Sequence, residues 1–373
     1  MSTRSGSHLA SDSPRPAPRV VLVTGAAGFI GANAVAWLLR ERSEVTVVSF
    51  DALTYAAHPE SLAMVTAGHE SRHHFVRGDV RDGAALAAVL RGDGRDAAGR
   101  LTPRPDVVWH LAAETHVDRS LLDPAIFVDT NVNGTLRLLE ALRAARDGGH
   151  PVRLVHVSTD EVYGSLSERE APFTETRPLA PTSPYAASKA AADLLVQAWS
   201  RTFALDALIT RCSNNYGPFQ FPEKLIPLMI TRALANEPLP VYGDGEQVRD
   251  WLYAADHVAA LWAVTCSSAR PGDVFNIGAS TERTNLTIVR GILDALGRDH
   301  ALITHVRDRP AHDRRYAMDS TRLQEETGWR PRVNFADGLA ATVQWYVAHD
   351  AWWRAVQGEA KRATDALYLK PIA

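Results

Sequence analysis

Residues 20–31 read Val20-Val-Leu-Val-Thr24-Gly25-Ala-Ala-Gly28-Phe-Ile-Gly31, and this stretch decides the fold. The apolar, β-branched run before Gly25 predicts a buried strand, and the stretch up to Arg40 predicts a helix. Glycines between a strand and a helix allow a tight turn whose backbone N–H groups approach an anion at the helix N-terminus. The spacing is GxxGxxG and not GxGxxG, so the three glycines alone do not exclude an ordinary strand–helix turn.

The same alternation continues along the chain. Apolar strands are predicted at 45–50, 74–76, 106–111, 153–158 and 207–211, with helices near 130–145 and 185–202 between them. Strands that alternate with helices favour a parallel sheet with right-handed connections. We therefore predict an α/β fold, in which a Rossmann-type doubly wound parallel sheet occupies residues 19–213.

The region from 214 to 373 breaks this rhythm with Pro- and Gly-rich segments and short helices at 226–235, 287–296 and 337–349. We predict a smaller mixed α/β C-terminal substrate lobe there, from which later segments can return to the first domain. Residues 1–18 are rich in Ser, Pro and Arg and are predicted to be a disordered tail. Residues 91–105 look like an inserted loop.

Composition excludes several classes of protein. The chain has 46% hydrophobic and 22% charged residues and a net charge of -3, without the basic stripe that nucleic-acid binding needs. No apolar stretch reaches the roughly 20 residues that span a bilayer. Cys212 and Cys266 lack disulfide or metal-ligand spacing. We expect a cytoplasmic protein that binds no nucleic acid, membrane or metal.

Two aspartates follow predicted strands. Asp51 stands twenty positions beyond Gly31 at the end of the next strand, where a carboxylate would hold both ribose hydroxyls of a dinucleotide. Because a carboxylate would repel a 2′-phosphate, NAD is favoured over NADP. Asp79 precedes Val80 at the end of the third strand, where it would meet the adenine edge or cap a helix.

Tyr185 and Lys189 form a YxxxK pair, which places both side chains on one helix face. A nearby ammonium, together with a positive nicotinamide ring, would lower the pKa of the phenol, so that tyrosine could act as a base. This spacing also occurs by chance on amphipathic helices. Together with the glycine loop and with Ser158-Thr159 at a strand end, it indicates hydride chemistry on an alcohol.

Asp160 and Glu161 follow the strand at 153–158, and parallel-sheet enzymes collect ligands at the carboxyl ends of their strands. Two neighbouring acids with separated pKa values can divide the work, one as a protonated donor and one as an ionised base. The alternative is a helix-capping or solvated acidic pair.

With these residues assembled, the chain resembles the dTDP-glucose 4,6-dehydratase family over essentially all of residues 20–353. The resemblance rests on long blocks in the family's order, among them TGAAGFIG (24–31), STDEVYG (158–164), SPYAASKAAAD (183–193) and RCSNNYGPFQFPEKLIP (211–227). It implies conversion of dTDP-glucose to dTDP-4-keto-6-deoxyglucose and water with NAD as cofactor. It also implies a homodimer, formed through the helices after Thr130 and from Tyr185.

The resemblance assigns chemical roles to five residues. Tyr185, supported by Lys189, would remove the C4 hydroxyl proton while hydride leaves C4, and Thr159 would hydrogen-bond the C4 oxygen. The C4 ketone acidifies the C5 hydrogen, so that Glu161 can abstract it while Asp160 protonates the departing C6 hydroxyl. Hydride then returns to C6.

The binding residues also follow from the resemblance. For the cofactor they are Gly25, Gly28, Phe29, Ile30, Gly31, Asp51, Thr54, Asp79, Val80, Ala112, Thr130, Tyr185 and Lys189. For the nucleotide sugar they are His116, Thr159, Asn214, Asn215, Lys224, Leu225, Pro240, Tyr242, Arg249, Asn285, His312 and Tyr316.

Several alternatives stay open from the sequence. Arg249 could be an ion-pair partner, Asn214-Asn215 a turn pair, and His116 and Tyr242 interior side chains. A nucleotide-sugar 4-epimerase would share the glycine loop and YxxxK but would not need Asp160 and Glu161. A UDP-glucose 4,6-dehydratase would differ only in its base contacts, and a silent NAD-binding scaffold would have no use for the catalytic set.

Overall fold

Seven parallel strands form the central sheet of the computed structural model, which describes residues 14–308 and 312–355. Their order across the sheet is β10-β6-β5-β4-β1-β2-β3. The strands are β1 (Val20–Thr24), β2 (Thr46–Asp51), β3 (His73–Arg77), β4 (Val107–His110), β5 (Arg153–Thr159), β6 (Ala207–Cys212) and β10 (Val274–Ile277). The chain runs from β1 outward to β3 and then returns to β4 on the other side of β1. This reversal creates a crevice at the carboxyl ends of β1 and β4, where doubly wound sheets bind ligands.

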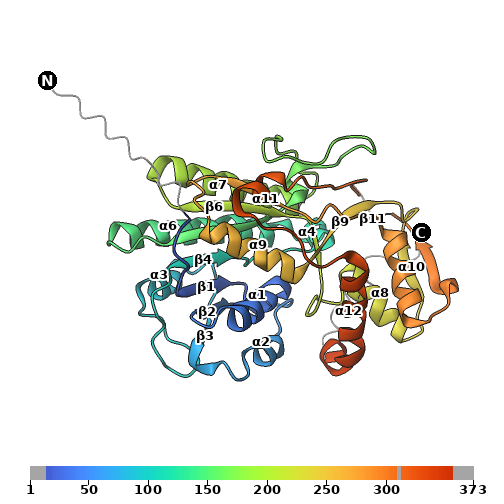
Figure 1. Cartoon of the computed structure of the whole chain (residues 1–373), viewed down its shortest axis with the longest axis horizontal. Helices are drawn as coiled ribbons and strands as arrows, with labels where there is room; N and C mark the ends of the chain where they lie inside the picture. The colour runs from blue at the N-terminus through green and yellow to red at the C-terminus, as the bar shows by residue number, and fades with distance from the viewer. Residues whose placement is uncertain (1–13, 309–311, 356–373) are drawn as a thin grey trace.

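Helices cover both faces of the sheet, so the domain has three layers (Figure 1). Val21 and Val23 of β1 belong to the core formed with α1 (Phe29–Glu41) and α9 (Ala254–Cys266). Leu22, whose side chain points the opposite way, belongs to the second core. That core is closed by α3 (Gly83–Arg91), α6 (Gly134–Asp147) and α7 (Pro184–Phe203). The predicted Rossmann-type fold is confirmed.

The sheet contains one strand from the second half of the chain. β10 pairs with β6 in parallel register, with Ile277 opposite Cys212. The sequence anticipated that later segments could return but did not locate this strand. The helix predicted near residues 130–145 begins as a π-helical turn, η2 (Val128–Asn133), before α6.

The smaller lobe combines two short sheets with three helices, on the right of Figure 1. One sheet has the order β11-β9-β7, and β12 pairs with β8 in the other. The strands are β7 (Asn214–Tyr216), β8 (Leu239–Tyr242), β9 (Val248–Tyr253), β11 (Glu282–Thr284) and β12 (Ile303–Val306). The helices are α8 (Leu225–Leu234), α10 (Asn285–Leu296) and α12 (Phe335–Ala348), close to their predicted ranges. The remaining elements are α2 (Pro59–Thr66), η1 (Glu70–Arg72), α4 (Val117–Leu122), α5 (Pro124–Phe127), η3 (Asp160–Tyr163), η4 (His300–Leu302) and α11 (Thr321–Thr327).

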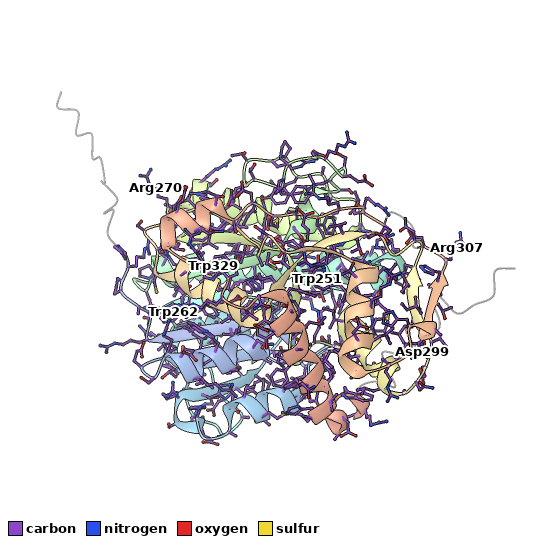
Figure 2. All side chains as sticks on the ribbon, turned by 45° about the vertical axis from the view of Figure 1, so that its right-hand side comes forward. Trp251, Trp262, Arg270, Asp299, Arg307 and Trp329 are labelled. Atoms are coloured by element: carbon purple, nitrogen blue, oxygen red, sulfur yellow. The ribbon has the colours of Figure 1, made fainter. Side chains whose placement is uncertain are left out.

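Large apolar side chains hold the two parts together. Trp251 and Trp329 are buried in the core that contains α1 and α9, and the indole of Trp329 donates to the Asp256 carbonyl. In Figure 2 these rings lie inside the molecule, whereas Arg270 and Arg307 extend at its periphery. The lobes therefore share apolar packing and are more than two tethered bodies.

The predicted disordered tail and the predicted inserted loop both take a definite form where the structure describes them. Of the predicted tail, residues 1–13 lie outside the described residues, and residues 14–18 lie against the sheet domain, where the Arg15 N–H donates to the Cys266 carbonyl at 2.9 Å. In the 91–105 segment, the buried Asp96 carboxylate binds Arg100 and His74. No helix in the described ranges is long and apolar enough to cross a bilayer.

Candidate active site

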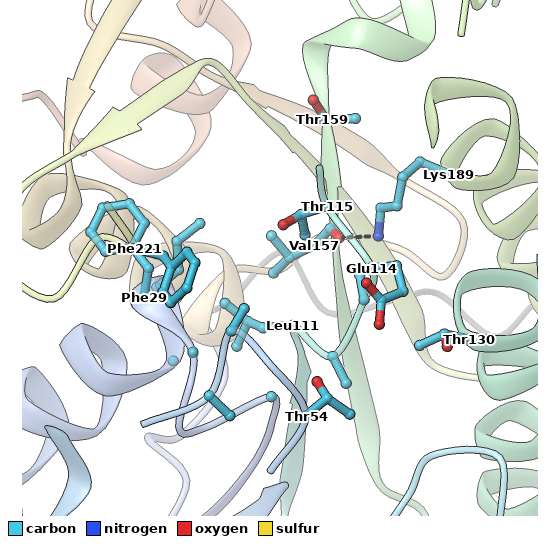
Figure 3. Close-up of a pocket in the computed structure, with 18 of the residues that line it drawn as sticks. Phe29, Thr54, Leu111, Glu114, Thr115, Thr130, Val157, Thr159, Lys189 and Phe221 are labelled. Atoms are coloured by element: carbon cyan, nitrogen blue, oxygen red, sulfur yellow. Dashed lines mark hydrogen bonds between the residues drawn. The ribbon is translucent and has the colours of Figure 1, made fainter. Parts of the chain in front are cut away.

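A cavity of about 330 Å³ opens at the carboxyl ends of β1, β2, β4, β5 and β6. Every residue predicted to bind the cofactor lines it, and so do all five predicted catalytic residues. Figure 3 shows Phe29 and Phe221 on one side of this cavity and Lys189, Glu114 and Thr130 on the other. The residues predicted from the sequence therefore form one connected site, although they lie up to 164 positions apart, between Gly25 and Lys189.

The glycine loop has two positions that no side chain could occupy. Gly25 has φ +70°, and a Cβ there would come within 2.7 Å of the Ala112 nitrogen. A Cβ on Gly31 would collide with the Gly25 carbonyl oxygen. Gly28 differs, because its Cβ would meet that oxygen at 3.4 Å, and it caps α1 without a side-chain hydrogen bond. Its position leaves the N-terminus of α1 open to an anion.

The two aspartates are held in different ways. Asp51 is 7% exposed and accepts from the Ala27 and Leu53 N–H groups at 2.8 and 2.7 Å. Burial raises its pKa, while these two bonds lower it. Asp79 binds Arg81 through both oxygens, which lowers the pKa of its carboxyl. The capping alternative is wrong for Asp79, because Asp82 caps α3.

Tyr185 and Lys189 lie on the same face of α7, as their spacing predicts. The expected lowering of the Tyr185 pKa depends on a nicotinamide ring as well as on Lys189. Burial, followed by the negative charge of Glu161, raises the pKa of Tyr185 well above its ordinary value. The Lys189 ammonium donates to the Val157 carbonyl at 2.8 Å (Figure 3), and burial lowers its own pKa to about 8.

The three residues that end β5 form a compact acidic corner. The hydroxyl of Thr159 caps the short helix η3 by accepting from the Glu161 N–H at 3.3 Å, and it donates to the Asp160 carboxyl at 3.2 Å. The capping alternative for the acidic pair is thus wrong, since Thr159 performs that function. Asp160 is 2% exposed, so it is not solvated either. Burial and the adjacent Glu161 charge raise the pKa of Asp160 well above its ordinary value, which favours its protonated form.

The residues predicted for the nucleotide sugar divide into two groups. Thr159, Asn214, Asn215 and Lys224 line the cavity. The lining does not include the other eight, which are His116, Leu225, Pro240, Tyr242, Arg249, Asn285, His312 and Tyr316. Asn214 and Asn215 belong to β7 and are not a turn pair. His116 caps α4 and lies 3.8 Å from the Glu223 carboxylate.

Four of those eight form a second cluster in the smaller lobe. The Arg249 guanidinium stacks on the ring of Tyr316 at 4.1 Å and donates to the carbonyls of Val248 and Asp313. The rings of Tyr242 and His312 make an edge contact, with centroids 6.4 Å apart. The charge of Arg249 acts on Asp160, so the cluster adjoins the acidic corner.

Some lining residues were missed. Glu223 directly precedes the predicted Lys224, and its side chain lies 3.4 Å from the Tyr55 hydroxyl and 3.6 Å from Arg119. Burial raises the pKa of both Glu223 and Glu114. Glu223 could have been predicted from the sequence, because it is a charged residue next to Lys224, which was predicted to bind substrate. No group of three or more His, Cys, Asp or Glu in the described ranges is placed to hold a metal ion.

Comparison with known proteins agrees with this geometry. The family model described as GDP-mannose 4,6 dehydratase matches residues 22–342. The dTDP-glucose 4,6-dehydratase of Xanthomonas campestris pv. campestris is 48% identical over 354 residues, covering 90% of this chain and 95% of the relative. The chain belongs to the dTDP-glucose 4,6-dehydratase family.

Solved structures place this dehydratase among relatives of more than one activity. DesIV, a dTDP-glucose 4,6-dehydratase from Streptomyces venezuelae with NAD and TYD bound, is 45% identical with a TM-score of 0.82, covering 90% of this chain and 99% of that one. A UDP-glucose 4-epimerase of Thermus thermophilus in complex with NAD is 30% identical with a TM-score of 0.76, covering 88% and 99%. The fold alone therefore does not separate a dehydratase from an epimerase.

Proposed function

We propose that this protein converts dTDP-glucose to dTDP-4-keto-6-deoxyglucose and water as an NAD-dependent hydro-lyase. The observation that carries the proposal is the buried Asp160 carboxyl beside Glu161, adjoining Thr159 and Tyr185 in one cavity. A buried acid with a raised pKa next to a second carboxylate suits elimination of water. Membership in the dehydratase family supports the same reaction.

The cavity fits NAD by the chemistry of its walls. Gly28 leaves the N-terminus of α1 accessible to a pyrophosphate, and Asp51 is fixed by two backbone bonds where a ribose would lie. When bound, NAD supplies a hydride acceptor at C4, a hydride donor at C6 and a positive ring near the tyrosine. We propose Phe29, Ile30, Thr54, Asp79, Val80, Ala112 and Thr130 as further walls of that site, because all of them line the cavity.

The first step needs a base for the C4 hydroxyl, and we assign that role to Tyr185, which lines the cavity. Since burial raises its pKa, the tyrosinate needs positive charge nearby. The Lys189 ammonium, four residues along α7, contributes part of that charge. Thr159 then hydrogen-bonds the C4 oxygen as alcohol and as ketone.

The elimination uses the acidic pair. Glu161 takes the proton from C5, which the C4 ketone has made acidic, and later gives it back to C5. Asp160 donates its proton to the C6 hydroxyl, which leaves as water. A positioned acid or base of this kind contributes roughly 10²–10⁴-fold to the rate.

The diphosphate and base would extend from the cavity toward the smaller lobe. Lys224 lies at the cavity wall, and the planar fork of Arg249 suits a phosphate oxygen pair. Tyr242 and His312 offer ring surfaces beyond it. We assign His116, Asn214, Asn215, Leu225, Pro240, Asn285 and Tyr316 to the same path. A uracil base would be read by the same groups, so UDP-glucose is the alternative substrate.

We also propose that two copies pair through α7 and its neighbours, in the cytoplasm where NAD and nucleotide sugars are made. Leu121, Leu122, Val128 and Leu194 are 43–68% exposed. They come from α4, η2 and α7, which pack on one another. Such an apolar patch fits a two-fold interface.

The deciding experiment uses dTDP-glucose deuterated at C4, with the product analysed by NMR and mass spectrometry. Deuterium at C6 of a 4-keto-6-deoxy sugar is the expected result. Deuterium retained at C4 with inverted configuration would identify an epimerase and contradict the proposal. If UDP-glucose is converted and dTDP-glucose is not, the substrate is UDP-glucose, and the proposed reaction type still holds.

The acidic pair gives the matched control for that assay. Asp160→Asn should still release some C4-oxidised sugar but should lose elimination by roughly 10²-fold or more. Asp337→Asn, on the surface of α12, should leave the product yield unchanged. Equal losses of oxidation and elimination in Asp160→Asn would remove Asp160 from the role of acid.

A further inference from the structure

The catalytic helix α7 is entered from an irregular stretch, residues 164–183, which separates it from η3. Tyr185 lies in the first turn of α7, directly after Pro184 and the cap Ser183. The N–H groups of a first turn have no partner within the helix, so the start of a helix depends on contacts from outside it. Ser183 supplies one such contact by accepting from the Ala186 N–H at 3.1 Å. The position of Tyr185 therefore also depends on what holds the chain just before this cap.

The residue that holds this part of the chain is Asp313. Its Oδ2 atom accepts from the Thr182 hydroxyl at 2.6 Å and from the Tyr316 phenol at 2.5 Å. Its backbone carbonyl accepts from Arg249 Nη2 at 2.9 Å. Thr182 immediately precedes the cap of α7, whereas Arg249 and Tyr316 belong to the second cluster in the smaller lobe. One residue thus joins the start of the catalytic helix to residues that we assign to the nucleotide.

The segment that follows Asp313 is held from two sides. The Tyr316 N–H donates to the Val248 carbonyl in β9 at 3.0 Å. On the other side, the Phe173 N–H donates to the Ala317 carbonyl at 2.8 Å, and both residues lie in one buried apolar cluster with Tyr316. Because a close-packed interior is stiff, this segment transmits a displacement instead of absorbing it.

The proposed reaction needs such a connection, because the substrate reaches from one lobe to the other. Its diphosphate would lie at Arg249, while its C4 hydroxyl must meet Tyr185 on α7. The length of the substrate is fixed, so the distance between these two residues must be fixed as well. A misplacement of about 1 Å can cost roughly 10²-fold in rate.

We propose that Asp313 is a positioning residue, which fixes the start of α7, and with it Tyr185, relative to the bound nucleotide. The proposal rests on the function proposed above and gives Asp313 no contact with the reacting atoms. Two donors from different parts of the chain converge on one carboxylate oxygen. Loss of that oxygen breaks both connections, whereas loss of the Thr182 hydroxyl breaks only the connection to α7.

The test measures kcat, KM and the isotope effect with dTDP-glucose deuterated at C4. Asp313→Ala should lower kcat by roughly 10²-fold and change KM by only a few-fold, because the sugar binds with C4 misplaced. The isotope effect on kcat should be no smaller than in the unmodified protein, since hydride transfer from C4 is the step that is slowed. Asp313→Asn keeps an oxygen that can accept both bonds, so its kcat should stay within a few-fold of the unmodified value.

Thr182→Val repeats the test at an exposed position, where the substitution does not threaten the fold. It should lower kcat by roughly 10-fold, the usual worth of a hydrogen bond to a charged group, and Thr182→Ser should not. Asp319→Ala is the matched control, because its carboxylate accepts from the Thr321 N–H at the start of α11. This control should leave kcat per bound NAD unchanged, and bound NAD counts the folded sites in every variant.

Three results would overturn the positioning role. A raised KM with unchanged kcat in Asp313→Ala and Thr182→Val would make Asp313 a binding residue only. Less folded protein with unchanged kcat per bound NAD would make it a purely structural residue. A smaller isotope effect would place the loss in a step after hydride transfer. In all three cases the unmodified protein still converts dTDP-glucose, whereas failure of the proposed function would abolish that conversion.

Discussion

The acidic corner at the end of β5 and the aromatic cluster around Arg249 are assembled in different ways. In the corner, Thr159, Asp160 and Glu161 are consecutive, and Tyr185 and Lys189 are one helical turn apart. In the cluster, Tyr242 ends β8, which pairs with β12, and its ring contacts that of His312. Tyr316 reaches Arg249 because its N–H donates to the Val248 carbonyl. Short spacings determine the first arrangement and long-range pairing the second. Substitutions should therefore affect chemistry in the corner and binding in the cluster.

The largest effect is expected in the glycine loop that lines the cavity. Gly31→Ala would drive a Cβ into the Gly25 carbonyl oxygen, so the loop must move and NAD binding should be lost. Gly297→Ala is the control, because its Cβ would have open space, and its φ of +60° costs only local strain. Nucleotide released from heat-denatured protein measures the difference. Normal NAD content in Gly31→Ala would mean that the loop is not the pyrophosphate site.

In the acidic corner, Tyr185→Phe should lower kcat by roughly 10²–10⁴-fold with little change in KM, because the phenol acts as a base. Tyr55→Phe is matched to it, since it removes a hydroxyl that contacts Glu223 at 3.4 Å. That control should stay within a few-fold of the unmodified kcat. A comparable loss in both variants would show that general disturbance of the cavity, and not base catalysis, limits the rate.

In the cluster, Arg249→Lys should raise KM by roughly 10–100-fold and change kcat much less, because lysine lacks the planar fork. Arg283→Lys is the matched control, since Arg283 lies opposite Arg249 in the β11–β9 pair and is exposed. Initial rates over a range of dTDP-glucose concentrations give both constants. A loss confined to kcat would contradict a binding role for Arg249 and would indicate that it supports the chemistry of the neighbouring Asp160.

The smallest effect is expected for His156, a buried residue of β5 that precedes the acidic corner. Burial lowers the pKa of His156, which lies 3.4 Å from Asp193, to about 4. Since its unfolded pKa is near 6.5, this neutral histidine stabilises the fold above that pH. The stability is lost as pH falls toward 4, at up to about 1.4 kcal/mol per pH unit. Urea unfolding between pH 7 and 4 tests this. His156→Gln should flatten the curve, and an unchanged slope would assign the acid sensitivity to other groups.

The same contrast explains what the sequence could predict. Strand and helix periodicity gave β1 to β6, α1 and α7, and the glycine, Asp51 and YxxxK spacings placed the cofactor and catalytic residues in one cavity. These patterns did not predict β10 or the pairing of β8 with β12. Those depend on contacts between distant segments and on burial, which no local spacing encodes.

The return of β10 to the central sheet also has a consequence for synthesis. β6 ends at Cys212 and its partner ends at Ile277, so 277 minus 212, or 65 further residues, must be made before the edge of β6 can be covered. At roughly 5–20 residues per second, that edge stays open for about 3–13 seconds on each ribosome. An unpaired strand edge is a template for association with other chains. The nascent chain is therefore most vulnerable to aggregation while its smaller lobe is being translated, and a fragment that ends before β10 would remain so permanently.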